Sequence, residues 1–75
     1  MKRAPAAAAT QAEARVRDRM KTDGADAFRR ARQYDALGRV PEAVALYERA
    51  VRYLDASDPN REAARARLEV LRARP

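Results

Sequence analysis

The fold is decided by residues 25–54, which read ADAFRRARQYDALGRVPEAVALYERAVRYL. The second half of this stretch keeps an apolar residue at every three- or four-residue step, which is the spacing of one helix face. The positions that carry this spacing are Val40, Ala43, Val44, Tyr47, Ala50, Val51 and Leu54. In the first half, Ala27, Ala31 and Tyr34 share a face in the same way. The pattern therefore predicts two successive helices.

A tight turn separates these two helices. Gly38 suits the end of the first one, because glycine enters the left-handed conformation without strain. Pro41 suits the first turn of the second, where its missing N–H costs nothing. So short a link predicts an antiparallel hairpin of helices over about residues 25–37 and 40–55. The small residues that would let the two backbones approach closely are Ala31, Ala43 and Ala50.

A third helix is expected after the hairpin. Asp58 and Pro59 have the residue types that begin a helix, and Leu68 and Leu71 then fall on one face. This helix should run over about residues 59–73. We therefore expect an all-α fold in which the antiparallel hairpin and the third helix form a three-helix bundle.

The N-terminal segment is less regular in pattern. We expect residues 1–20 to be mobile or to form an accessory helix, and residues 21–75 to form the domain. Gly24 allows two alternatives. Either Asp23 caps a new helix after a break, or Gly24 lies inside one long helix at a cost of about 1 kcal/mol. We favour the break or a frayed first segment.

The composition limits the classes of function that the chain can have. A chain of 75 residues supports one small domain with a thin core. It contains neither Cys nor His, and Ser57 is its single serine. Thiol chemistry, the usual zinc ligand sets and a Ser-His-Asp triad are thereby excluded. The paired acids lie at cap and turn positions, where such residues stabilise helix starts. We expect no enzymatic activity, no cofactor and no bound metal.

The hairpin resembles two families of helical module. Its small, aromatic and glycine positions resemble a tetratricopeptide (TPR) hairpin, and they are Ala31, Tyr34, Gly38, Ala43, Tyr47 and Ala50. The long second helix, Asp35 and the closing residues 67–71 are instead similar to a microtubule-interacting and trafficking (MIT) domain. Either resemblance implies a TPR-like hairpin fold over about residues 20–72. We favour MIT, because a lone TPR hairpin cannot bury its outer face. An unrelated hairpin is the third reading.

The MIT resemblance implies a protein-binding function. In MIT domains, grooves between helices hold tail peptides of ESCRT-type membrane-remodelling subunits. We expect a corresponding groove between the second and third helices, in which a partner helix or peptide of acidic character lies. Its candidate residues are Leu46, Val51, Arg52, Leu54, Arg65, Leu68, Leu71 and Arg72. The alternative for each leucine is that it belongs to the core.

Other functions fit the sequence less well. One alternative is a TPR-like adaptor, and another is a helical homodimer in which the outer apolar face of the second helix, with Leu46 and Tyr53, pairs two copies. The net charge of +6 fits weak attraction to nucleic acid or to microtubules, but no aromatic-basic interleaving or phosphate loop accompanies it. No apolar run approaches the length of a membrane span, and no secretory signal is visible. A soluble cytoplasmic protein that does not insert into membranes is the expectation.

Overall fold

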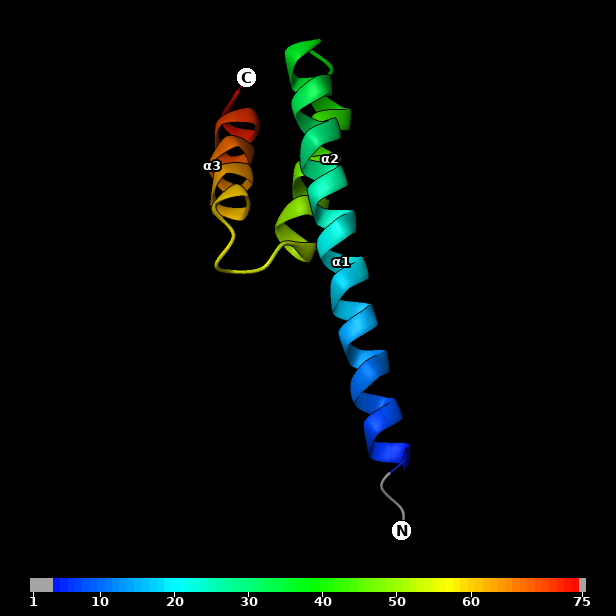
Figure 1. The fold of residues 1–75 in the computed structure, drawn as a ribbon. Coiled ribbons are helices and arrows are strands. Elements are labelled where there is room, and N and C mark those ends of the chain that lie inside the picture. Colours follow the sequence, from blue (N-terminus) through cyan, green and yellow to red (C-terminus); the bar gives the residue numbers. More distant parts are fainter. Residues whose placement is uncertain (1–3, 75) are drawn as a thin grey trace.

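The chain folds into three α-helices. The computed structural model describes residues 4–74, with the side chains of residues 15, 19 and 22–74. The helices are α1 (Ala4–Ala36), α2 (Val40–Tyr53) and α3 (Pro59–Ala73), and the described residues form no strand. Figure 1 shows α2 and α3 lying beside the C-terminal half of α1. The predicted all-α three-helix architecture is therefore confirmed.

The turn between α1 and α2 has the predicted chemistry. Gly38 adopts a φ of 75°, the left-handed conformation that ends a helix. The N–H of Gly38 donates to the carbonyl of Asp35 at 3.0 Å, and the N–H of Arg39 donates to the carbonyl of Tyr34 at 2.9 Å. This pair of bonds is a Schellman motif, which satisfies the last carbonyls of α1 and reverses the chain. The predicted antiparallel hairpin is confirmed.

Alanine dominates the contact between α1 and α2. Ala31, Ala43 and Ala50 are each 0 % exposed, and Tyr47 fills the space beside them. Five of the nine buried hydrophobic residues are alanine. Because alanine projects only a methyl group, two helices can approach closely along such a face. The complete buried set is Ala27, Ala31, Ala43, Tyr47, Ala50, Leu54, Ala64, Leu68 and Leu71.

The expected break near Gly24 is wrong, because α1 continues through it without interruption. Gly24 is buried, and a Cβ built there would lie 2.9 Å from the backbone nitrogen of Leu54. Glycine is therefore needed where the end of α2 meets α1, and this packing offsets its low helix propensity. Asp23 caps no new helix and instead forms an ion pair with Arg49 of α2, at 4.0 Å.

The N-terminal half of α1 extends beyond the other two helices (Figure 1). At about 1.5 Å per residue, 33 residues of α1 are more than twice as long as the 14 residues of α2. The helix crosses the expected boundary at residues 20 and 21 without a break. Most side chains before residue 22 lie outside the described set, so the division into residues 1–20 and 21–75 stays a prediction.

The third helix packs against α2 through a small leucine and alanine face. Asp58 caps it, its Oδ1 accepting from the N–H of Asn60 at 2.9 Å, and Pro59 follows in the first turn. Its buried residues are Ala64, Leu68 and Leu71. The guanidinium of Arg61 donates to the carbonyl of Val51 at 3.1 Å, which ties the start of α3 to the end of α2.

Within residues 4–74, none of the three helices combines the length and the apolar character that a membrane crossing requires.

The alanine crossing yields a first testable prediction. Replacing Ala43 or Ala50 by Leu should overpack the helix contact and lower the free energy of unfolding by about 1–3 kcal/mol, measured by denaturant titration. Ala45→Leu is the matched control, because Ala45 is an exposed residue of the same helix. That control should change stability by no more than about 0.5 kcal/mol. Equal stability of all three variants and the parent would contradict the crossing.

Gly24 yields a second prediction. Helix propensity alone would predict the opposite sign for the change in stability when Gly24 is replaced by Ala. At an open helix position, Gly→Ala stabilises by about 1 kcal/mol. Here Gly24→Ala should destabilise by about 1 kcal/mol or more, because the added methyl group meets the Leu54 backbone. Ala25→Gly, at the exposed neighbouring position, measures the local cost of glycine in α1. A gain in stability from Gly24→Ala, equal to the loss from Ala25→Gly, would rule out the close approach.

Candidate functional site

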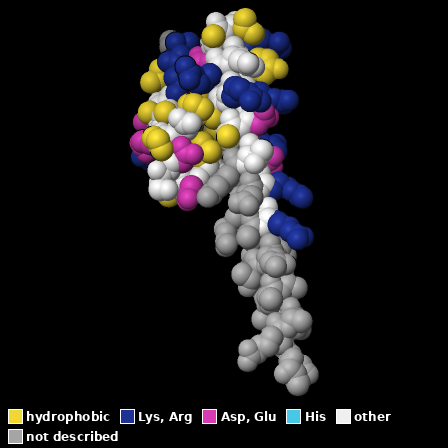
Figure 2. Space-filling model, in the orientation of Figure 1, with side chains coloured by type: hydrophobic (Ala, Val, Ile, Leu, Met, Phe, Trp, Pro, Cys, Tyr) yellow, Lys and Arg dark blue, Asp and Glu magenta, His cyan; other side chains and the backbone are white. Residues whose placement is uncertain are grey.

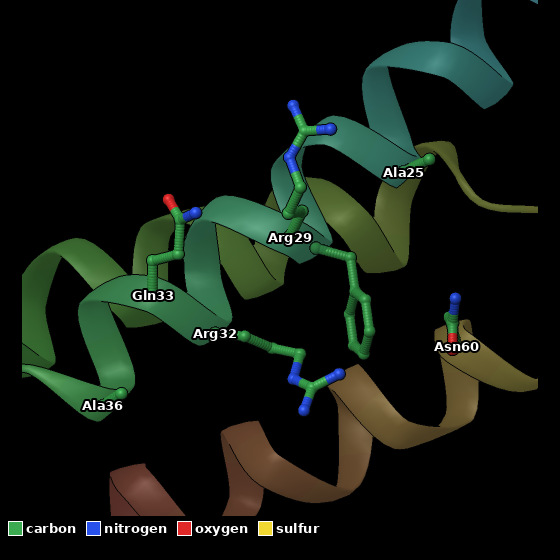
Figure 3. Close-up of a pocket in the computed structure, with 7 residues that line it drawn as sticks. Ala25, Arg29, Arg32, Gln33, Ala36 and Asn60 are labelled. Atoms are coloured by element: carbon green, nitrogen blue, oxygen red, sulfur yellow. The ribbon is translucent and has the colours of Figure 1, made fainter.

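An open hollow of about 550 Å³ lies along α1 and reaches the start of α3. Figure 3 shows Arg32 extending from α1 toward α3, whereas Arg29 and Gln33 extend to the other side of α1. The ring of Phe28 is half-buried in the same hollow. The residues that line it are Ala25, Phe28, Arg29, Arg32, Gln33, Ala36 and Asn60.

A second hollow of about 290 Å³ adjoins the first. Its lining residues are Arg32, Asp35, Ala36, Tyr47 and Arg67. The two hollows share Arg32 and Ala36, so they adjoin along α1, and each reaches a residue of α3. We call the two adjoining hollows the α1–α3 trough. Arg32 lies where its two parts meet.

The floor of the trough is closed by an ion pair and a hydrogen bond, which together join all three helices. Arg67 of α3 makes a two-pronged contact with Asp35 of α1, at 2.7 Å from Nε to Oδ2 and 2.9 Å from the terminal nitrogen to Oδ1. The hydroxyl of Tyr47, on α2, donates to the same Oδ2 at 3.0 Å. Such a two-pronged contact fixes geometry as well as charge. Asp35 is thus the polar centre of the bundle.

These contacts shift two ionisations. The hydrogen bond from Arg67 lowers the pKa of Asp35 below its ordinary value of 3.8, against the opposing effect of burial. Burial raises the pKa of Tyr47 to about 12, and its hydrogen bond to Asp35 adds to the rise. At neutral pH the floor of the trough is therefore a carboxylate held by a guanidinium and a neutral phenol.

Phe28 and Arg32 form the exposed wall of the trough. The Phe28 ring packs edge-on against Tyr47, with 6.1 Å between ring centroids. The guanidinium carbon of Arg32 lies 6.0 Å from the centroid of Phe28, a cation–π arrangement. In this position the guanidinium of Arg32 lies beside an apolar surface.

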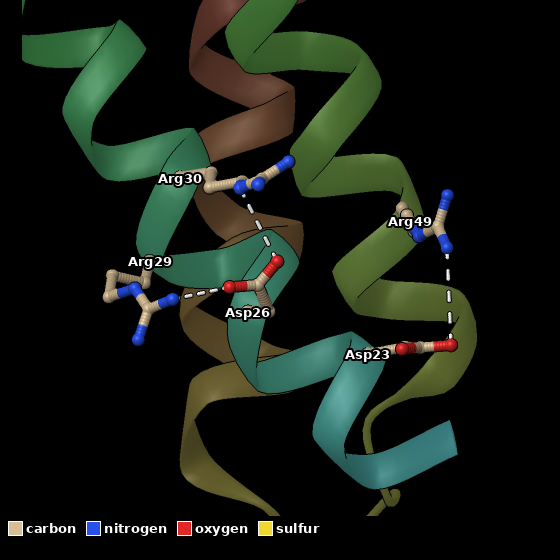
Figure 4. Close-up of polar contacts among 5 residues, drawn as sticks. All are labelled: Asp23, Asp26, Arg29, Arg30 and Arg49. Carbon is tan, nitrogen blue, oxygen red and sulfur yellow. Dashed lines mark hydrogen bonds and ion pairs between the residues drawn. The ribbon is translucent and has the colours of Figure 1, made fainter. Parts of the chain in front are cut away.

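The neighbouring cations already have partners. Asp26 forms ion pairs with Arg29 and with Arg30, and Asp23 forms one with Arg49, as Figure 4 shows. Arg67 is bound to Asp35. Figure 2 shows basic side chains interspersed with acidic ones over the face in view.

Arg32 differs from these arginines. Among the residues whose side chains the structure describes, no carboxylate lies within 4.0 Å of Arg32. Its guanidinium lies over the ring of Phe28. Within the side chains that the structure describes, Arg32 is therefore the cation of the trough that forms no ion pair.

The eight residues predicted to form a groove between α2 and α3 are not brought together on one open surface. Leu54, Leu68 and Leu71 are only 6 %, 4 % and 3 % exposed and belong to the core. Leu68 and Leu71 lie on the buried face of α3, and Leu54 lies against Gly24 of α1, so a partner could reach these leucines only by separating the helices. The alternative reading of these leucines as core residues is the one that the burial supports.

The other predicted groove residues are spread around the bundle. Leu46 is half-buried and lines a small hollow of about 140 Å³ between α1 and α2. Val51 is half-buried, Arg52 is exposed and Arg65 pairs with Glu62 of its own helix. Arg72 pairs with Glu48 across α2 and α3. A binding role for Leu46, Val51, Arg52, Arg65 and Arg72 stays a prediction.

The sequence analysis missed the trough because the ion pair at its floor joins residues that are distant in sequence. Arg67 and Asp35 are separated by 32 positions, and neither carries a motif that predicts the pair. The signal that was present locally is Phe28 with Arg32, one helical turn apart on the same face.

The acids of the bundle have structural roles. Asp58 caps α3, Asp35 binds Arg67, and Asp23 and Asp26 pair with arginines. Across the residues described in full, no group of three or more acidic side chains could hold a metal ion. The arrangement offers apolar surface, amide groups and one unneutralised guanidinium, which are the elements of a binding surface.

Comparisons with protein families, with curated proteins and with solved structures find no match to this chain.

The Asp35 ion pair yields a third prediction. Because the folded-state pKa of Asp35 is lowered, its contribution to stability is fully present above the ordinary value of 3.8 and is lost as the pH falls through the folded value. Asp35→Asn should lower the free energy of unfolding at neutral pH, and the gap to the parent should close on acidification toward about pH 2. Urea titrations across this pH range measure the effect.

The control for this prediction is Glu62→Gln, which removes a carboxylate from the exposed pair with Arg65. An exposed pair is screened by solvent and contributes little. We therefore expect a smaller loss from Glu62→Gln than from Asp35→Asn. Equal losses from the two variants would show that the Asp35 contact is no stronger than a surface ion pair.

Proposed function

We propose that this chain is a non-catalytic protein-binding module that holds a short segment of a partner protein in the α1–α3 trough. The observation that carries the proposal is the half-buried Phe28 ring beside the unneutralised Arg32, in an open depression between two helices. Aromatic side chains, including Phe, and arginine are enriched at protein interfaces relative to the rest of the surface.

The packing of the trough supports this role. Its walls are helices, which position side chains more firmly than loops, and its floor is fixed by the Asp35–Arg67 pair. Ala25 and Ala36 are exposed and small, so they leave room for a docked segment. The net charge of +6 favours a partner of acidic character. A partner segment in this trough replaces the α2–α3 groove expected from the sequence.

The resemblance to MIT and TPR hairpins is retained as part of the proposal. The crossing at Ala31, Ala43 and Ala50, with a third helix packed on the second, is an architecture that both families would use. MIT remains the first reading and TPR the second. By this resemblance, the chain would be an adaptor that carries one partner protein to another complex.

The test fills the trough without disturbing the core. Short random peptides would be selected on the full chain, and their affinities measured by fluorescence anisotropy. Ala36→Trp places a bulky ring in the trough and should weaken the selected peptides about tenfold or more. Ala66→Trp is the matched control, because Ala66 is an exposed alanine of α3 outside both hollows. It should leave the affinity within about twofold.

Chemical-shift mapping of the same peptides locates their site independently. We expect the amide signals of Phe28, Arg32 and Asn60 to move on binding. Peptides that leave these signals unchanged and bind Ala36→Trp as tightly as the parent would refute the proposal.

A self-associating module is the second candidate, and one observation favours it. Leu37 is 72 % exposed and Val70 is 48 % exposed. Leu37 lies in the hairpin turn and Val70 near the end of α3, and Figure 1 places both of these regions at the same end of the bundle. An apolar end of this kind could pair two copies. Sedimentation at submicromolar and micromolar loading decides this, and a monomer at both removes the candidate.

A further inference from the structure

We infer that Arg32 selects partner segments that carry one acidic side chain in their interior, next to an apolar residue that covers Phe28. This inference rests on the proposed function and names the chemistry of the partner. It starts from the distribution of charge in the trough, where Arg32 alone has no carboxylate neighbour in the described part of the chain.

The first step concerns the number of acidic groups that the trough accepts. Arg29 already pairs with Asp26, and Arg67 already pairs with Asp35. A second acidic group would have to displace one of these carboxylates or lie beside it, and like charges at close range repel. One free guanidinium therefore matches one carboxylate, and a run of acidic residues gains little over a single one.

The second step concerns where the acidic group lies in the segment. Arg32 lines both parts of the trough and lies at their junction. The first hollow reaches Asn60 at the start of α3, and the second reaches Arg67 farther along α3. A segment that occupies both hollows therefore passes Arg32 between its two ends. The group that meets Arg32 is then an internal Asp or Glu side chain, not a chain terminus.

The third step concerns the residue beside it. Phe28 is half-buried, and the guanidinium of Arg32 covers it at 6.0 Å. When Arg32 turns its N–H donors to a carboxylate, an apolar side chain of the partner can cover the rest of the ring. Excluding water from this contact strengthens the ion pair. Arg32 and Phe28 therefore recognise the acidic residue and the apolar residue of the segment together.

The experiment uses the peptides that bind the full chain and lose affinity on Ala36→Trp. Each is synthesised with its acidic residue changed to Gln or Asn, and each form is titrated against the parent chain, Arg32→Gln and Arg29→Gln. Arg29 is the matched control, because it borders the same hollow but is already paired. Amidated peptides test the terminal carboxylate, and poly-glutamate tests the acidic run.

We expect an acidic residue in every selected peptide. Removing it should cost about tenfold in Kd on the parent chain and nothing further on Arg32→Gln, the result of a coupled pair. Arg29→Gln and peptide amidation should change Kd by less than about twofold, and poly-glutamate should bind more weakly than the selected peptides. Circular dichroism and melting confirm that Arg32→Gln is folded.

Two outcomes would overturn the inference while leaving the trough as a docking site. One is a set of trough-binding peptides without an acidic residue. The other is an equal loss of affinity on the parent and Arg32→Gln chains when the acid is removed. If no selected peptide depends on Ala36 or shifts the trough amides, the proposed function itself fails, and the inference fails with it.

Discussion

The close approach of α1 and α2 is the constraint on which the rest of the structure depends. Four of the positions along it carry the two smallest residue types, namely Gly24, Ala31, Ala43 and Ala50. Because these side chains take almost no space, the larger neighbours must fill the sides of the contact instead of its centre. Tyr47 accordingly lies at the edge of the crossing, where its hydroxyl donates a hydrogen bond to Asp35. The polar centre of the bundle is thus a product of alanine packing.

The position of α3 follows from two different interactions. Its leucines bury against α2, and this apolar contact is non-directional. The Asp35–Arg67 pair is directional, and it sets how far α3 turns toward α1. Because the second interaction joins α1 to α3 at one end of their shared face, the rest of that face stays open. The trough therefore exists because an ion pair, and not a layer of apolar side chains, connects these two helices there.

What the sequence could predict was local. The hairpin, the Gly38 turn and the Asp58 cap were correctly predicted because helix periodicity and turn chemistry act within a few residues. The break at Gly24 was wrongly favoured because the reason for glycine there is Leu54, which lies 30 positions later in the chain. A glycine that ends a helix and one that admits a neighbouring backbone look alike in sequence.

The candidate binding surface was harder to predict for the same reason. Leu68 and Leu71 have the sequence signature of both a groove wall and a core face, and only the position of α2 distinguishes the two. The unneutralised state of Arg32 is likewise a tertiary property. Of the arginines around it, Arg29 has an acid one turn away, whereas Arg67 finds its acid on another helix. Counting charges along the chain cannot separate these cases.

Because the core is thin, a bound partner would also change the stability of the fold. Five of nine buried residues are alanine, so little apolar surface holds the bundle together, and a domain of this length has a small margin of stability. A partner that binds only the folded form adds to that margin by mass action, by about 2.7 kcal/mol at a hundredfold excess over Kd. Since a segment in the trough would contact α1 and α3 together, its binding energy would add to the least-packed pair of helices. In the proposed docking mode, binding and folding would therefore be linked through the same face.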